Sequence, residues 1–209
     1  MLSALLLAWY DENKRVLPFR GTKDPYRVWV SEIMLQQTRT ETVGAYYQRF
    51  LQRFPDVFAL SAAPEQDVLK CWEGLGYYSR ARNLQKAAKI IMSTHKGAFP
   101  RTYDAIRALP GVGDYTAGAI ASICFDARTP AVDGNVLRVM SRLLDDHGCT
   151  DDRKVKRRFS DMLAEIYPAE AGTFTQALME LGATVCVPNG APDCGACPVD
   201  DLCMARQRG

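Results

Sequence analysis

The sequence predicts an all-α protein of about ten short helices that ends in a cysteine-rich loop. Three observations carry this prediction. Apolar residues recur at spacings of three and four through most of the 209-residue chain, as they do along one face of a helix. Strand signals are nearly absent, since no longer stretch alternates between apolar and polar residues with β-branched enrichment. Glycine and proline divide the helical stretches with tight loops.

The predicted helices follow one another along almost the whole chain. An apolar run opens the sequence at Met1–Tyr10, and Asp11 and Glu12 close it. The segment Val28–Phe50 has no proline and is interrupted only by Gly44, so we expect helix throughout it. The same spacing predicts helices over residues 64–72, 79–95, 103–109, 116–125, 135–146 and 155–167.

Composition places the chain among ordinary globular proteins. Hydrophobic residues make up 47% and charged residues 24%, which excludes a mostly disordered or fibrous chain. The first apolar run is too short to cross a bilayer and lacks the basic start of a signal peptide. We therefore expect a cytoplasmic protein with no membrane partner. The net charge of +2 is too small to indicate a polyanionic partner by itself.

Four cysteines lie within 18 residues near the C-terminus, in the spacing C-x7-C-x2-C-x5-C: Cys186, Cys194, Cys197 and Cys203. Four thiolates so close together can surround a zinc ion or an iron–sulfur cluster. The metal would supply folding energy that this loop-rich segment cannot gain from an apolar core. Two disulfides are the alternative, which a reducing compartment disfavours. The spacing does not decide between zinc and [4Fe–4S].

A glycine-rich turn between two predicted helices could hold a phosphate. Gly111, Val112 and Gly113 allow a sharp turn whose N–H groups point outward, beside the N-terminus of the helix that follows. An ordinary helix–turn–helix with glycine caps is the alternative.

A second turn, over residues 74–78, contains two glycines and two tyrosines that look exposed. Arg80 and Arg82 follow it. Aromatic rings beside arginines suit stacking on bases and contacts to phosphates.

Two carboxylates stand in unusual places. Glu32 lies in the apolar helical stretch Val28–Leu35, where a buried carboxyl group has a raised pKa and can serve as a general acid. A glutamate on the solvent face is the alternative. Asp133 precedes the predicted helix that starts at Asn135, where it fits an ionised N-cap. One protonated and one ionised carboxylate are the pair that glycosidic bond cleavage requires.

The sequence resembles a known family, the helix-hairpin-helix DNA glycosylases of the endonuclease III superfamily. Within that family it is most similar to the adenine DNA glycosylases of the MutY type. The segments that carry the resemblance occur in the family's order and cover almost the whole chain: Leu17–Arg20 (LPFR), Trp29–Thr38 (WVSEIMLQQT), Trp72–Arg82 (WEGLGYYSRAR), Leu109–Ile120 (LPGVGDYTAGAI), Val132–Val139 (VDGNVLRV), Leu178–Cys186 (LMELGATVC) and the four cysteines.

The resemblance implies a two-lobed helical fold. A six-helix lobe over residues 21–126 would carry the helix-hairpin-helix, and residues 1–20 with 127–209 would form a lobe whose four cysteines hold a [4Fe–4S] cluster. Double-stranded DNA would lie across the cleft between the lobes, with a mispaired adenine flipped out of the stack. The family suggests a monomer, bound to the nucleoid if the host is bacterial.

Catalytic roles follow from the same motifs. Glu32 would protonate the adenine ring and then help to activate water, and Asp133 would stabilise the sugar cation or add to it. Asn135 would support this site. Tyr115 stands where bifunctional relatives carry a Schiff-base lysine. A phenol cannot form that imine, so the resemblance implies a monofunctional glycosylase in which Tyr115 orders the pocket.

Seven further residues match substrate-contacting positions of the family. Three of them match the adenine pocket: Arg20, Leu35 and Gln176. Four match the residues that wedge the duplex and meet the opposite base, typically 8-oxoguanine: Gln37, Thr38, Leu75 and Tyr77. Leu35 and Leu75 could instead be plain core residues, and Arg20 could belong to a surface ion pair.

The sequence departs from the family pattern in three ways. The first cysteine loop, residues 187–193, has seven residues and no lysine or arginine, and Asp114 occupies a hairpin position where a basic residue is common. Both changes predict weaker phosphate contacts. The basic run Arg153–Arg158 could compensate, or could be a solvated helix start. The sequence also ends shortly after Cys203, before the domain with which relatives recognise 8-oxoguanine.

Two other functions compete with an adenine glycosylase. Thymine glycosylases that act on T·G mismatches also carry a tyrosine in the hairpin, although Gln176 and the Leu35–Thr38 block favour adenine. A non-catalytic DNA-binding or redox-sensing cluster protein would fit the weaker phosphate contacts. The presence of both Glu32 and Asp133 argues against that reading.

Overall fold

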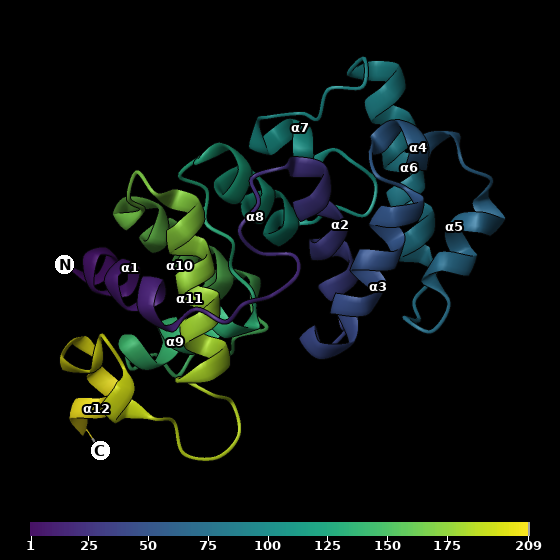
Figure 1. Ribbon diagram of the computed structural model, residues 1–209. Helices are drawn as coiled ribbons and strands as arrows, with labels where there is room; N and C mark the ends of the chain where they lie inside the picture. Colours follow the sequence, from purple (N-terminus) through teal and green to yellow (C-terminus); the bar gives the residue numbers. More distant parts are fainter. Residues whose placement is uncertain (209) are drawn as a thin grey trace. The chain divides into compact units, whose positions relative to one another are not determined.

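The computed structural model describes residues 1–208, and in that range it contains only helices and loops (Figure 1). The all-α fold class is confirmed. The chain divides into two compact units. The continuous unit is Val16–Phe125, and the split unit joins Met1–Arg15 to Asp126–Gly209. No helix within residues 1–208 is long and apolar enough to cross a membrane.

The unit boundaries differ slightly from the expected lobes, which changed at residues 20–21 and 126–127. Arg15 belongs to the split unit because it contacts Glu180, a fully buried carboxylate on α11 (Ala171–Thr184). The Arg15 backbone N–H donates to Glu180 Oε1 at 3.0 Å, and the guanidinium donates to both carboxylate oxygens at 2.7 and 3.0 Å. This contact ties the N-terminal helix to the far end of the sequence.

The continuous unit packs its helices around Trp29, Phe50 and Trp72, which are fully buried. Its central helix is α2, which contacts α3, α6 and α8. Asp24 caps α2 by accepting from the backbone N–H groups of Tyr26 and Arg27. The helices of this unit are α2 (Pro25–Leu35), α3 (Thr40–Arg53), α4 (Val57–Ala62), α5 (Glu65–Trp72), α6 (Ser79–Thr94), α7 (Tyr103–Arg107) and α8 (Asp114–Phe125).

The prediction of one helix over Val28–Phe50 is wrong, because a turn separates α2 from α3. Gln37 adopts a left-handed backbone conformation with φ of 57°, which costs a non-glycine residue about 1–2 kcal/mol. Three carbonyls at the end of α2 accept hydrogen bonds from the buried side chain of Arg80, on α6. This long-range contact ends the helix, and the local sequence gives no sign of it.

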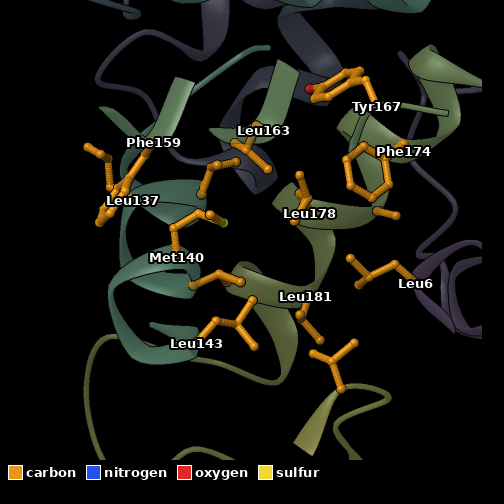
Figure 2. Close-up of a cluster of buried hydrophobic side chains, with 14 of the residues drawn as sticks. Leu6, Leu137, Met140, Leu143, Phe159, Leu163, Tyr167, Phe174, Leu178 and Leu181 are labelled. Carbon is orange, nitrogen blue, oxygen red and sulfur yellow. The ribbon is translucent and has the colours of Figure 1, made fainter. Parts of the chain in front are cut away.

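The split unit is built around α11, which contacts both α1 (Leu2–Asn13) and α9 (Gly134–Leu143). Figure 2 shows side chains from these helices and from α10 meeting in one apolar cluster; the labelled members are Leu6, Leu137, Met140, Leu143, Phe159, Leu163, Tyr167, Phe174, Leu178 and Leu181. The elements of this unit are α1 (Leu2–Asn13), α9 (Gly134–Leu143), α10 (Arg153–Ile166), α11, two 3-10 turns at Cys194–Ala196 and Asp200–Leu202, and α12 (Met204–Arg208).

The segment after Val185 contributes little to this cluster. Within residues 186–208 only Val199 is buried. Cys186, Cys197 and Cys203 are partly buried and pack against the edge of the apolar cluster. The expectation that this segment cannot form a core of its own is confirmed.

Candidate active site

Glu32 lies in the middle of α2 and is only 7% exposed. The alternative of a solvent-facing glutamate is therefore wrong. Its Oε2 atom accepts a hydrogen bond of 2.7 Å from the hydroxyl of Tyr115. Tyr115 is in the first turn of α8, so the turn that precedes α8 places a phenol against a carboxyl group 83 residues away in sequence.

The turn between α7 and α8 is the predicted hairpin. Gly111 has a φ of 79°, and a Cβ atom there would lie 2.8 Å from Cβ of Asn83, so this position requires glycine. Val112 is buried, and its carbonyl accepts from Arg107 at 2.9 Å. Gly113 is exposed beside the start of α8. The glycine turn before the N-terminus of α8 therefore lies where the sequence analysis expects a phosphate contact, and that contact stays a prediction.

Asp114 carries less repulsive charge than the sequence suggests. Its Oδ1 atom accepts from Arg107 Nε at 2.5 Å and from the hydroxyl of Tyr103 at 3.3 Å. The guanidinium of Arg107 therefore offsets the carboxylate within the hairpin itself. Because the pair is exposed, salt screens what remains of its field.

Two turns of the continuous unit hold the four residues expected at the opposite base. Gln37 and Thr38 lie in the α2–α3 turn, and Leu75 and Tyr77 lie in the turn between α5 and α6. Gln37 is exposed, and Tyr77 is 62% exposed with a left-handed φ of 48°. Leu75 is buried, so it supports its turn from inside.

The expectation that Arg80 contacts phosphate is wrong, because its side chain is only 8% exposed. The guanidinium donates to backbone carbonyls and to the Thr38 hydroxyl instead. Arg82 is paired with Glu65 at 3.1 Å. The signal in the sequence was ambiguous, since an arginine beside aromatic residues suits both a nucleic-acid surface and a buried clamp.

The three residues expected in the adenine pocket lie in different parts of the fold. Arg20 is in the loop before α2, and Leu35 is the last residue of that helix; both are partly buried. Gln176 is on α11 of the split unit. Its Oε1 atom accepts from the Tyr10 hydroxyl at 2.8 Å, which leaves the amide NH₂ group as the end that can donate.

Asp133 caps α9, as the sequence predicts. Its Oδ1 atom accepts from the Val136 backbone N–H at 2.8 Å, and its Oδ2 atom accepts from Asn135 Nδ2 at 2.8 Å. Burial raises the pKa of Asp133 above its ordinary value, while the hydrogen bonds from Val136 and Asn135 oppose that rise. A partly buried carboxylate held in a fixed orientation results.

Two arginines that the sequence analysis did not single out connect α9 to the cysteine segment. Arg138 donates to Asn135 Oδ1 at 2.8 Å and to the carbonyl of Cys186 at 2.7 Å. Arg142, one turn further, donates to Cys186 Sγ at 3.2 Å. Their spacing of four residues on one helix face was the available signal. Asp133, Asn135 and the first cysteine thus share one hydrogen-bonded chain.

The four C-terminal cysteines line one cavity of about 630 Å³. None of these four cysteines forms a disulfide in the part of the chain that the structure describes, in contrast to the alternative of two disulfide bonds. Burial raises the pKa of Cys197, and the neighbouring thiols of Cys186, Cys203 and Cys194 add to the rise. In residues 1–208 no three potential ligands already form a closed metal cage. Four free thiols around one space, with Arg142 on Cys186, form a donor set that fits a thiolate-bound metal group.

Comparisons with known proteins identify the family to which the chain belongs. The family model described as "HhH-GPD superfamily base excision DNA repair protein" matches residues 30–165. The chain belongs to the HhH-GPD superfamily. The matched region contains Glu32, both turns, the hairpin and Asp133, so the HhH-GPD core includes the main elements described above.

The chain is also similar to individual proteins, by sequence and by structure. A rat adenine DNA glycosylase is 46% identical over 97% of the chain, and the chain spans 41% of that relative's length. Among solved structures, a thermostable thymine-DNA glycosylase has a TM-score of 0.89 at 26% identity, covering 100% of this chain and 96% of that one. An endonuclease III–DNA complex has a TM-score of 0.80 at 24% identity, with coverage of 99% and 95%.

Proposed function

We propose that this HhH-GPD protein is a DNA glycosylase that hydrolyses the N-glycosidic bond of adenine mispaired with 8-oxoguanine or guanine in double-stranded DNA. The observation that carries the proposal is the buried Glu32 carboxyl group, held on α2 by the Tyr115 hydroxyl at 2.7 Å. The 46% identity to an adenine DNA glycosylase supports adenine as the base.

The chemistry requires an acid and a stabiliser. Glu32 protonates the adenine ring, which makes the base a better leaving group, and then accepts a proton from the attacking water. Asp133, ionised and oriented by Asn135, stabilises the positive charge that develops on the sugar or adds to it transiently. The adenine must leave the base stack before Glu32 can reach it.

Tyr115 makes the enzyme monofunctional in this proposal. An amine is needed to form an imine with the opened sugar, and a phenol has none. The strand should therefore stay intact until alkali cleaves the abasic site. The hydroxyl of Tyr115 instead holds Glu32. Arg20, Leu35 and Gln176 are the residues that we assign to recognition of the adenine.

For the metal group we propose a [4Fe–4S] cluster bound by Cys186, Cys194, Cys197 and Cys203. When bound, such a cluster supplies four iron–thiolate bonds, which fix a segment that has almost no apolar core. Arg142 donates to one of the four sulfurs. Equal amounts of iron and sulfide in the purified protein, without zinc, would support this assignment; zinc in their place would contradict it.

The test is a single-turnover assay on duplexes that contain A·8-oxoguanine, A·G or T·G, each with and without alkali. Release of adenine, with strand cleavage only after alkali, is the expected result. The rate ratio between the two adenine substrates measures how far this chain reads the opposite base.

A thymine glycosylase is the second candidate, because a thymine-DNA glycosylase matches the fold with a TM-score of 0.89 over the whole chain. Thymine release from T·G, without adenine release, would establish it and overturn the pocket assignments. No release from any duplex by protein with its cluster intact would favour a non-catalytic DNA-binding or redox-sensing role.

We also propose an oligomeric state and a cellular location for the protein. It acts as a monomer on double-stranded DNA in the cytoplasm, at the nucleoid if the host is bacterial. Sedimentation of the protein with and without a mispaired duplex tests the monomer: one chain per duplex is expected, and a dimer on the duplex would contradict it.

A further inference from the structure

Arg80 joins the two turns that present Gln37 and Tyr77. Its Nη1 atom donates to the carbonyls of Ile33, Met34 and Gln36 at 3.1, 2.9 and 2.5 Å. These carbonyls lie at the end of α2, where a helix leaves acceptors without partners and where a cation is favoured. The guanidinium is therefore the C-terminal cap of the helix that carries Glu32.

The other end of the same guanidinium holds the second turn. Arg80 Nη2 donates to the carbonyls of Leu75 and Gly76 at 3.0 and 3.2 Å, and to Thr38 Oγ1 at 3.2 Å. The guanidinium carbon also lies 5.4 Å from the ring centroid of Trp72 and 5.6 Å from that of Tyr77. One planar fork thus fixes two turns that are about 40 residues apart in sequence.

Both turns need such support because each contains a strained residue. Gln37 and Tyr77 have φ values of 57° and 48°, in the left-handed region that is unfavourable for residues with a side chain. Both side chains are exposed, so their own packing supplies little compensation. Both terminal nitrogens of Arg80 donate to the two turns and to the end of α2, whereas its buried Nε has no hydrogen-bond partner within residues 1–208.

We propose that Arg80 is a positioning residue that locks the turns at residues 36–39 and 74–78 together and thereby determines how Gln37 and Tyr77 meet the base opposite the excised adenine. The proposal rests on the glycosylase function. Glu32 is held separately by Tyr115, so loss of the clamp should weaken recognition of the mispair more than the chemical step.

The test compares Arg80→Met with Gln85→Met. Gln85 is also buried on α6 and donates to backbone carbonyls, at 2.7 Å to Ala63 and 3.4 Å to Leu60, but it does not touch either turn. The first readout needs no DNA: hydrogen exchange of the amides of Thr38 and Leu75, which are bonded to the carbonyls of Leu35 and Trp72. These amides should exchange at least about tenfold faster in Arg80→Met and not in Gln85→Met.

The second readout compares the affinity for a mispaired duplex with the single-turnover rate of base release. Arg80→Met should raise the Kd for an A·8-oxoguanine duplex by about tenfold or more, and lower the rate ratio between 8-oxoguanine and guanine as opposite base. Its single-turnover rate at saturating enzyme should change about threefold or less, as should every value for Gln85→Met. Unchanged exchange at both turns, or faster exchange without loss of affinity, overturns the proposal.

Arg80→Lys keeps the test decisive if Arg80→Met does not fold. An ammonium is a point charge and cannot bridge both sets of carbonyls, so one turn should stay protected while the other loosens. A lysine variant identical to the parent in exchange and affinity overturns the clamp. Failure of the parent to release adenine would refute the proposed function, whereas the exchange measurement reports on the clamp itself.

Discussion

The hydroxyl of Tyr115 donates a hydrogen bond of 2.7 Å to the buried carboxyl group of Glu32. A hydrogen bond to a charged group is worth about 1.5–3 kcal/mol. We expect Tyr115→Phe to slow adenine release by about ten- to a hundredfold, because Glu32 loses the donor that orients it. Single-turnover rates at saturating enzyme measure this effect.

Tyr26→Phe is the matched control. Tyr26 is also buried, and its hydroxyl donates to the Phe54 carbonyl at 2.7 Å, away from Glu32. Loss of that bond should lower the Tm by about 2–4 °C for each kcal/mol lost and leave the rate unchanged. Equal slowing by both variants would show that the effect of Tyr115 is general loss of packing.

Asp133 should determine the pH at which the single-turnover rate falls on the acid side of its profile. Its pKa is raised mainly by burial, so activity that depends on the ionised carboxylate is lost as the pH falls, and at a higher pH than for an ordinary aspartate. Between the ordinary and the raised pKa the folded state holds a proton that the unfolded chain has released, so stability falls as pH rises through that window.

Asn135→Ala removes one of the hydrogen bonds that oppose this rise. The acid limb of the single-turnover rate should therefore move to still higher pH. Measured profiles of the parent and the variant check the direction. An acid limb that stays in place, or moves to lower pH, would remove Asp133 from the catalytic pair.

At the scale of elements, close packing of α9 against α11 fixes the start of α9. A Cβ atom at Gly182 would lie 2.6 Å from Asn135 Cβ and 3.1 Å from its backbone. Gly182→Ala should therefore destabilise the fold by about 1–3 kcal/mol. Thermal melts test this, with Gly134→Ala as the control, since a Cβ there meets nothing within 4 Å. An unchanged Tm for Gly182→Ala would contradict the packing.

The cysteine segment should depend on its metal group more than any helix does. Because only Val199 is buried within residues 186–208, removal of the proposed cluster with an iron chelator should take away most of what fixes this stretch. Limited proteolysis after chelation should cut first within residues 186–208 and leave Val16–Phe125 intact. Early cleavage inside the continuous unit, with the cysteine segment protected, would contradict this prediction.

At the scale of the whole molecule, the sequence predicts what depends on local pattern. Helix periodicity predicts the all-α class, and an aspartate just before the helical stretch at residues 135–146 predicts the cap at Asp133. The sequence did not predict α11, because apolar residues surround most of that helix and no polar face alternates with an apolar one. It also missed the break after Leu35, because the cause is Arg80, more than 40 residues away.

In the candidate site, too, the sequence predicts the residues that lie in local motifs but not the long-range contacts. Residue types and motif order singled out Glu32, Tyr115 and Asp133, because each lies in a short recognisable segment. The carbonyl acceptors of Arg80, Arg138 and Arg142 could not be predicted, since each lies in another segment of the chain; only the spacing of Arg138 and Arg142 marked them as one face of a helix. A carbonyl acceptor belongs to every residue type and leaves no mark in the sequence.

We propose above that Glu32 transfers the protons of the reaction, rather than serving only as a buried residue of α2. Glu32→Gln keeps the size of the side chain and one oxygen that can accept from Tyr115, but removes its proton-transfer function. The decisive measurement follows base release and duplex binding by this variant on A·8-oxoguanine DNA. We predict that adenine release is abolished while the Kd stays within about threefold of the parent. Adenine release at the parental rate would contradict the account.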